Sequence, residues 1–270
     1  MIILGIETST PRTGIALGET GRGVLAEISV AGGRRHVETL VPAIELCCVA
    51  AGISLPEVRV IAADVGPGLY SGLRVGVASA NALASSLGAR VIGVSSLDLL
   101  AAGVCCRHPS VMAVLDARRG EVFYASYRVP GSGRRTWDAS GWERTAEPAI
   151  ARPSDVCAEL VRSGREWLLV GDGAVRYEEQ FTANPAIMLA ERNLAAPSAS
   201  VLVEMALGAH PSCSPEGAQS EGAASLRPLY LRPPDAKINW ERHRSPGLAV
   251  RAGVEPAGAA LEVAGVSEST

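Results

Sequence analysis

The sequence predicts an α/β protein built of two related lobes, on three observations. Apolar runs of strand length alternate with longer stretches whose apolar residues recur at helical spacing. One pattern occurs twice, at 2–18 and at 111–128: an apolar strand that ends in an acidic residue, a tight turn and a second strand. The chain has 270 residues, of which 47% are hydrophobic and 20% charged, enough to bury a sizeable core. We therefore expect each lobe to open with antiparallel strands and to continue through a helix into a parallel strand.

The first lobe is expected to span residues 1–105. Its opening strands are predicted at 2–6, 14–18 and 24–30, because these runs are apolar or alternate with period two. From His36 to Ala51 the period changes to that of a helix, which Gly52 ends. Pro42 is tolerated only near a helix start, so the regular part of this helix is expected to begin close to it.

The stretch Gly66–Leu87 is the one around which the first lobe is organised. It follows a predicted strand at 58–64, and its Gly-Pro-Gly corner can continue neither a strand nor a helix. The remainder predicts a helix that ends at Gly88. Small residues recur every fourth position and so line one face of that helix: Gly72, Gly76, Ala80 and Ala84. This face either rests on the sheet of its own lobe or admits the helix of a partner, and the spacing alone favours the sheet.

A strand at 90–94 and a short helix from about Leu97 complete the first lobe. The second lobe, residues 106–236, is expected to contain strands at 111–115, 121–128 and 167–170, helices at 154–162 and 198–207, and a last edge strand at 229–231. Residues 237–270 are rich in Pro, Gly and Ala and lack periodicity, so we expect a mobile tail there.

Charge and cysteine usage narrow the class of protein. The formal net charge of −3 provides no overall attraction to nucleic acid or to an anionic membrane. Lys237 is the only lysine among 25 cationic residues, so paired arginines are a weak sign of phosphate binding here. None of the six cysteines forms a C-x-x-C pair, which favours a reducing compartment. With no signal peptide and no apolar run of membrane-spanning length, we expect a cytoplasmic protein.

Five segments, in this order, resemble the TsaB family: ILGIETSTPRTGIALGE, RHVETLVPAI, DVGPGLYSGLRVGVASANALASSLGARVIGVSSLDLLA, VLDARRGEVFYASY and PLYLRPPDA. The resemblance runs in order over residues 2–128, with scattered support to Ala236 and no counterpart beyond it. It implies a duplicated ribonuclease-H-like fold of two lobes, as in actin, sugar kinases and chaperone ATPases. This fold agrees with the repeat of strand, acid, turn and strand.

The resemblance also implies a role in a complex. TsaB is the non-catalytic relative of TsaD, the subunit that transfers a threonylcarbamoyl group to the adenosine beside the anticodon of tRNA. The implied partners are TsaD by direct pairing and the ATPase TsaE within the complex. The complex is where tRNA would be met and where ATP and magnesium would act, while no membrane is involved. Alone, the subunit is expected to form a homodimer.

The same resemblance implies that the two long helices of the first lobe meet the partner. Close approach would be allowed by the small residues of the second helix, and apolar contact would come from their neighbours and from the first helix. The interface candidates are Gly72, Leu73, Gly76, Val77, Ala80, Leu83, Leu40 and Ile44.

No catalytic residue and no metal ligand is assigned from the sequence. In the catalytic relative, the segment that corresponds to Val94–Leu100 carries closely spaced histidines, and here it contains none. Ser95 and Asp98 have the spacing of a capping box, so we expect them to start the following helix. His36 stands at the predicted helix entrance, where we expect a structural polar contact.

The alternative function is a stand-alone, weak nucleotide-binding ATPase or phosphotransferase of the actin-like fold. Its candidate residues are Glu7, Thr8 and Ser9 in the first turn and Asp116 and Arg118 in the second. The sequence has no P-loop, and a complete set of an acid, a magnesium-binding pair and a phosphate clamp cannot be named from it.

Overall fold

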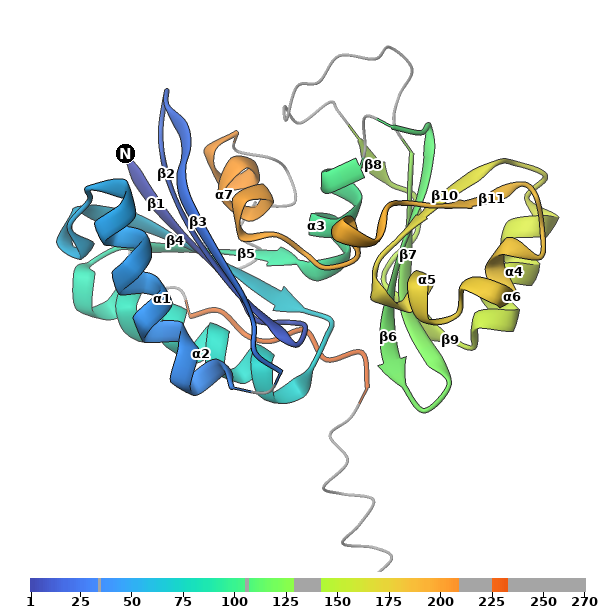
Figure 1. The fold of residues 1–270 in the computed structure, drawn as a ribbon, viewed down its shortest axis with the longest axis horizontal. Coiled ribbons are helices and arrows are strands. Elements are labelled where there is room, and N and C mark those ends of the chain that lie inside the picture. The colour runs from blue at the N-terminus through green and yellow to red at the C-terminus, as the bar shows by residue number, and fades with distance from the viewer. Residues whose placement is uncertain (34, 105–106, 129–141, 209–224, 233–270) are drawn as a thin grey trace, which may run out of the picture. The chain divides into compact units, whose positions relative to one another are not determined.

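The computed structural model describes residues 1–33, 35–104, 107–128, 142–208 and 225–232. They form two separate mixed sheets with helices packed on them (Figure 1). The expected tail at 237–270 lies outside the described residues.

The first sheet has the strand order β3-β2-β1-β4-β5. Its strands are β1 (Ile2–Glu7), β2 (Arg12–Glu19), β3 (Gly23–Ala31), β4 (Val58–Gly66) and β5 (Arg90–Ser95). The first three are antiparallel, whereas β4 pairs in parallel with β1, and β5 with β4. Parallel pairing requires a helical crossover, and the two long helices provide it.

The second sheet repeats this order as β11-β10-β6-β7-β8, with β9 also paired to β7. Its strands are β6 (Ser110–Arg118), β7 (Glu121–Arg128), β8 (Glu143–Arg144), β9 (Ala149–Ala151), β10 (Trp167–Val170) and β11 (Ile187–Leu189). Again the opening hairpin is antiparallel, and β10 and β11 add in parallel. The predicted duplicated ribonuclease-H-like fold of two lobes is therefore confirmed.

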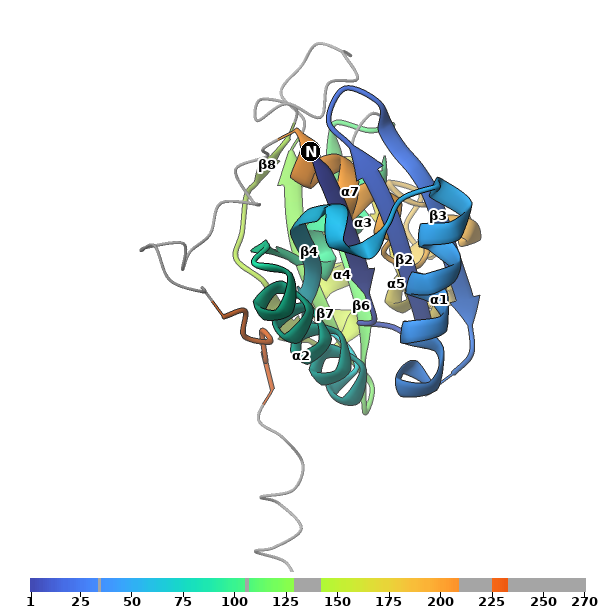
Figure 2. The same ribbon diagram turned by 90° about the vertical axis from the view of Figure 1, so that its left-hand side faces the viewer.

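The described helices are α1 (His36–Ala51), α2 (Tyr70–Leu87), α3 (Ser96–Val104), α4 (Pro153–Arg162), α5 (Asp172–Arg176), α6 (Glu178–Thr182) and α7 (Ala199–Leu207), with short 3-10 turns η1 (Leu55–Glu57) and η2 (Arg192–Leu194). Helices α1 and α2 lie side by side on one face of the first sheet (Figure 2). Leu4 of β1 packs toward them with Leu40 and Ile44, while its neighbour Ile3 packs on the opposite face. Both faces are covered, which explains why β1 carries no polar side chain from Ile2 to Ile6.

The lobes exchange their last helices. Helix α3 follows the first sheet but packs against β6, and α7 follows the second sheet but packs against β1 and β2. One hydrophobic core consequently contains Ile3 of β1, Val111 of β6 and Leu202 of α7. The division at 1–105 and 106–236 separates the two sheets. We keep it as a proposal for the sheets alone, because α7 belongs to the second segment but packs on the first sheet.

Two local predictions were wrong. Residues 229–231 form no strand, although the Leu229 N–H donates to the Val65 carbonyl at 2.7 Å, because Pro228 has no N–H with which to extend a ladder. Helix α1 begins at His36, six residues before Pro42, so the proline lies inside the helix. Pro42 is exposed there, and the helix lacks one backbone hydrogen bond because proline has no N–H.

The small-residue face of α2 packs inside its own lobe. A Cβ atom at Gly72 would lie 2.0 Å from the Thr8 carbonyl oxygen, and one at Gly76 would lie 2.2 Å from Thr8 Oγ1. The interface candidates are thereby corrected. Leu83 is half-buried, and the other seven are buried within the chain: Gly72, Leu73, Gly76, Val77, Ala80, Leu40 and Ile44. A partner can reach these helices only through their other faces.

We predict that Gly72→Ala lowers the free energy of unfolding by about 2–3 kcal/mol, because the new methyl group meets backbone. The control is Gly103→Ala in α3, where a Cβ meets nothing within 4 Å and helix propensity adds about 0.5 kcal/mol of stability. Urea denaturation of both variants measures the difference. Equal stabilities for the two would contradict the packing described.

Candidate functional site

The first hairpin, between β1 and β2, is closed by helix α2. Glu7, Thr8 and Ser9 are each at most 1% exposed. The Thr8 hydroxyl donates to the Gly72 carbonyl at 2.8 Å, and the Leu69 N–H donates to the Ser9 carbonyl at 2.7 Å. These three nucleotide-site candidates are thus brought together, but their side chains are turned into the fold.

Glu7 forms a buried acidic pair with Asp64, which lies on the neighbouring strand β4. One Glu7 carboxyl oxygen accepts from both the N–H and the hydroxyl of Ser9, at 2.7 Å each. Asp64 Oδ1 accepts from the Gly66 N–H at 2.8 Å and from the Ser96 hydroxyl at 2.6 Å, whereas Asp64 Oδ2 is buried with no hydrogen-bond partner. Each carboxylate is therefore held by donors of its own chain.

Burial makes both acids keep their protons to a higher pH than usual, and Glu7 keeps its proton at neutral pH. Burial, with the charge of Asp64 as a smaller cause, raises the pKa of Glu7 to about 8. Burial also raises the pKa of Asp64 to about 6. A hard cation such as magnesium requires ionised oxygen ligands and several of them. Within the described ranges, no three His, Cys, Asp or Glu side chains gather in a metal-binding arrangement.

In the second hairpin, between β6 and β7, the Asp116 carboxylate is paired with neighbouring N–H and guanidinium groups. The Asp116 N–H donates to Asp172 Oδ1 at 2.9 Å, which ties the hairpin to the start of α5. Asp116 Oδ1 accepts from the Arg118 N–H at 2.9 Å, and Oδ2 pairs with the guanidinium groups of Arg118 at 3.0 Å and Arg176 at 3.6 Å. Asp116 and Arg118 thus bind each other and not the nucleotide-site candidates of the first hairpin.

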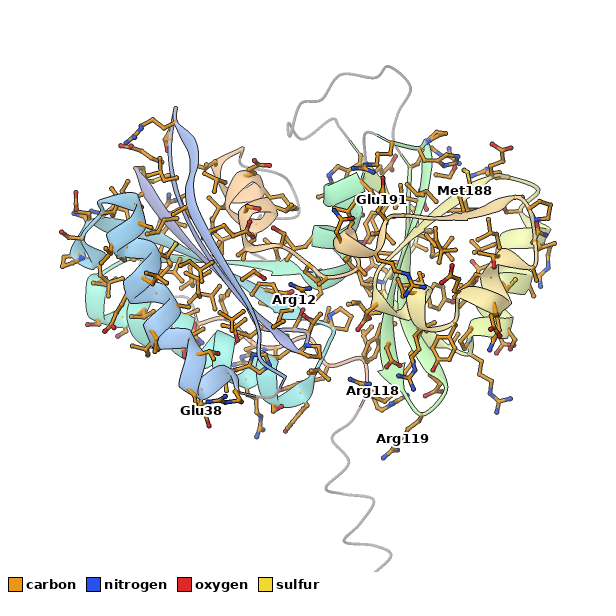
Figure 3. The ribbon with its side chains drawn as sticks, viewed as in Figure 1. Arg12, Glu38, Arg118, Arg119, Met188 and Glu191 are labelled. Carbon is orange, nitrogen blue, oxygen red and sulfur yellow. The ribbon has the colours of Figure 1, made fainter. Side chains whose placement is uncertain are left out.

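A cleft of about 370 Å³ is lined by the apex of the first hairpin, Thr10 to Arg12, and by Asp172 and Arg192. Figure 3 shows Arg12 between the two sheets. None of the five nucleotide-site candidates lines this cleft. The structure therefore does not assemble those candidates into one site.

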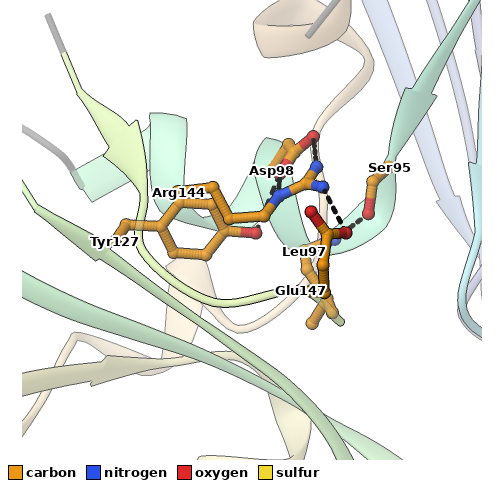
Figure 4. Close-up of polar contacts among 6 residues, drawn as sticks. All are labelled: Ser95, Leu97, Asp98, Tyr127, Arg144 and Glu147. Atoms are coloured by element: carbon orange, nitrogen blue, oxygen red, sulfur yellow. Dashed lines mark hydrogen bonds and ion pairs between the residues drawn. The ribbon is translucent and has the colours of Figure 1, made fainter. Parts of the chain in front are cut away.

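Asp98 anchors a buried polar cluster that joins α3 to the second sheet (Figure 4). Its carboxylate accepts from the Tyr127 hydroxyl at 2.8 Å and forms a salt bridge with Arg144, which also reaches Glu147 at 3.4 Å. The prediction that Asp98 caps the helix was wrong, although the Ser95 hydroxyl does accept from the Leu97 N–H at 3.3 Å. The partners stand 29 and 46 residues away in sequence, so no local pattern could reveal them.

His36 makes the expected structural contact at the start of α1. Its Nδ1 lies 2.9 Å from the Thr13 hydroxyl, and its Nε2 is buried without a hydrogen-bond partner. Burial lowers the pKa of His36. The neutral ring is thus favoured between β2 and α2.

Comparison with known proteins identifies the family. A model described as TsaD, tRNA N6-adenosine threonylcarbamoyltransferase, matches residues 18–240. The tRNA threonylcarbamoyladenosine biosynthesis protein TsaB of Escherichia coli is 31% identical over 175 residues, which cover 64% of this chain and 72% of that protein. The chain belongs to the TsaB family. TsaB of Haemophilus influenzae agrees, at 26% identity over 90% of this chain and 97% of its own length.

Solved structures support the TsaB assignment. A Pseudomonas aeruginosa protein, described as uncharacterized with similarity to peptidase YeaZ, superposes with a TM-score of 0.69 at 27% identity and covers 86% of this chain and 99% of its own. YeaZ from Pseudomonas aeruginosa gives a TM-score of 0.63 at 25% identity, over 76% of this chain and 91% of its own. In the described part of this TsaB-family chain, no helix combines the length and the apolar character needed to cross a membrane.

Helix α1 of this TsaB-family chain exposes four large apolar side chains, which we call the α1 face. Val37 (73% exposed) and Val41 (56%) lie on one side of the helix, and Leu46 (57%) and Val49 (79%) lie further round it, with the exposed Glu38 and Glu45 between the two pairs. At its end lies a hollow of about 390 Å³ lined in part by Cys48, Val49 and Leu55. The helical period groups Val37 and Val41 with Leu40 and Ile44 in one apolar stripe, and it does not show that the sheet covers only the latter two.

We predict that Glu7→Gln removes part of the pH dependence of stability. The folded pKa of Glu7 is about 8 and its ordinary value 4.5, so between these values the folded state keeps a proton that the unfolded state releases. Stability therefore falls as pH rises through this window, by up to about 1.4 kcal/mol per pH unit, and Glu7→Gln escapes this loss.

Urea unfolding at pH 5, 6.5 and 8 measures the effect. Glu45→Gln, at an exposed position of α1, removes one formal charge and serves as the control that should follow the wild type. Parallel curves for Glu7→Gln and the wild type would show that Glu7 is ionised in the fold.

Proposed function

We propose that this chain is a non-catalytic subunit that pairs with a TsaD protein and supports threonylcarbamoylation of the adenosine next to the anticodon in tRNA. The observation that carries the proposal is the α1 face, four large apolar side chains left exposed on one helix. Apolar patches of this kind mark interaction sites in proteins that are otherwise covered by polar side chains. The names of the TsaB relatives supply the pathway.

The proposed absence of catalysis is supported by how the chain uses its acidic residues. Glu7 and Asp64 are buried, Glu7 holds a proton at neutral pH, and Asp98 is neutralised by Arg144. Asp116 is paired with two arginines. In this proposal ATP, magnesium and the ATPase TsaE act in the complex, and tRNA is met through it, in the reducing cytoplasm.

The pairing surface we propose is the outward side of α1 together with α2, replacing the buried candidates. Val37 and Val41 are four residues apart and Leu46 and Val49 three, which places each pair on neighbouring turns. Exposed small residues, Ala78 and Ala82, occupy the outward side of α2. In the absence of TsaD, the same surface would pair two copies of the chain.

We predict that Val41→Asp weakens association with TsaD at least about tenfold, because a charge at the centre of an apolar contact loses its hydration. Val161→Asp is the matched control, since Val161 is similarly exposed, at 48%, on α4 of the second lobe. Co-purification with tagged TsaD and light scattering of the free chain measure the pairing, and circular dichroism verifies the fold.

Equal loss of TsaD in both variants, or in neither, would contradict this pairing surface. Threonylcarbamoyl transfer to tRNA by the chain without TsaD would contradict the non-catalytic role. Turnover of ATP by the isolated chain, followed by calorimetry with ATP and magnesium, would favour the alternative of a stand-alone ATPase.

A further inference from the structure

Strand β3 forms a long edge of the first sheet. It spans nine residues, and within the described ranges it pairs with β2 alone. A bulge leaves Leu25 out of this pairing, after which Ala26 to Ala31 pair with β2 in continuous register. Figure 2 shows β3 as the outermost strand, with α1 in front of it. The outward backbone N–H and carbonyl groups along these six residues are therefore available to a further strand.

The other sheet edges are short or occupied. Strand β8 has two residues and β11 has three. Strand β5 lies beside the segment 225–232, since a Cβ atom at Gly93 would lie 3.2 Å from Leu226 Cδ2, and the Asn81 side chain bonds both backbone groups of Leu226, at 2.9 and 3.0 Å. After its bulge, β3 contains no proline and a single charged residue, Glu27. Natural sheets protect long edges, so an unprotected one indicates a place where another strand pairs.

Helix α1 packs on β2 and β3 and reaches the open edge. The Cys47 thiol lies 3.5 Å from the Ala26 carbonyl oxygen of β3. Thr39 lies at the end of β3, because a Cβ atom at Gly32 would be 3.9 Å from its Cγ2. Leu46 follows Thr39 by two helical turns, so it faces the same side of the helix, where it is 57% exposed.

This position of α1 suits a second copy of the chain added through β3. Neighbouring strands are about 4.8 Å apart, so a two-fold axis beside β3 would lie about 5 Å from a helix placed above β2 and β3. The two α1 axes would then be about 10 Å apart, which is the separation of packed helices. Leu46 of each copy would fill the space between them. A stable interface buries about 800 Å² on each partner, and the helix contact adds to the area that the strand buries.

Side-chain chemistry selects an antiparallel register centred on Ile28. Ala26 and Ile28 pack toward α1, whereas Glu27 and Ser29 are exposed on the other face. A register centred on Glu27 would place like charges opposite each other, but with Ile28 on the axis Glu27 lies opposite the partner's Ser29. Arg12 Nη1 lies 3.5 Å from Ser29 Oγ within one chain, so the partner's Arg12 would approach Glu27.

Glu27 and Arg12 carry the complementary charges of this contact. Among the residues that the structure describes, neither side chain forms an ion pair, and Glu27 accepts from the Ser198 hydroxyl at 2.9 Å. Asp172 and Arg192, which line the same cleft as Arg12, carry opposite charges. A two-fold contact would thus form two Arg12–Glu27 pairs, one on each side of the axis.

We propose that two copies of the chain join through β3, so that their five-stranded sheets become one sheet of ten strands, with Leu46 of the two α1 helices packed across the axis. Val37 and Val41, on another side of α1, remain for TsaD. A complex with TsaD would therefore contain two copies of each subunit. That stoichiometry rests on the proposed function, whereas the β3 contact itself does not depend on it.

The test uses the full chain carrying Val41→Asp, which weakens pairing through the outward side of α1 and α2 and so isolates the β3 contact. Light scattering and sedimentation equilibrium should show a dimer. Adding Arg12→Glu should raise its dissociation constant at least about tenfold, because two ion pairs become two repulsions. Adding Glu27→Arg as well should restore the constant to within about threefold of the starting value. The control, Arg165→Glu, reverses an exposed charge beyond α4 and should change the constant less than about twofold.

Hydrogen exchange locates the contact. The backbone amides of residues 26–31 should exchange more slowly above the dissociation constant of the dimer than below it. With TsaD, the wild-type chain should give two copies of each subunit, and Arg12→Glu one of each. Circular dichroism verifies the fold of every variant.

A monomeric Val41→Asp variant at about 100 μM, unchanged exchange at 26–31, or equal losses with Arg12→Glu and Arg165→Glu would overturn the β3 contact. A wild-type complex with one copy of each subunit would overturn it too. Failure of TsaD to bind would contradict the proposed function alone, because the measurements on the free chain do not involve TsaD.

Discussion

The close contact between Thr8 and helix α2 is the constraint on which the first lobe depends. The Thr8 hydroxyl donates to the Gly72 carbonyl, and only glycine at 72 leaves room for the Thr8 backbone. The approach closes the first hairpin over Glu7, so this carboxyl is cut off from water and holds its proton. It also fixes where α1 sits, because the buried ring of His36 lies beside Gly72 and Thr13. With one side of α1 committed to the sheet, its other side is left outward, and that side is the α1 face.

Asp64 and Asp98 of the first lobe are both turned inward. Asp64 accepts from Gly66 and Ser96, and Asp98 joins Tyr127 and Arg144. A buried ion pair of this kind contributes little net stability, because desolvation offsets much of the attraction, but removing one partner leaves an unpaired charge. Such pairs specify one arrangement of the elements that they join. In this chain they join α3 to β7 and β8, where the exchanged helix crosses from the first sheet to the second.

The sequence by itself did not determine the short elements β8, β9, β11, α5 and α6, but it determined the order of the longer elements, the repeat of the two lobes and membership of the TsaB family. These depend on local signals: apolar period, the Gly88 helix end, and motifs of consecutive residues. It did not determine which partner each residue meets. Only the tertiary structure decided that Gly72 faces Thr8, 64 residues away, that Asp98 faces Arg144, 46 away, and that α7 returns to the first sheet. The physical reason is that a period shows which residues share a face, whereas what covers that face depends on contacts between distant segments.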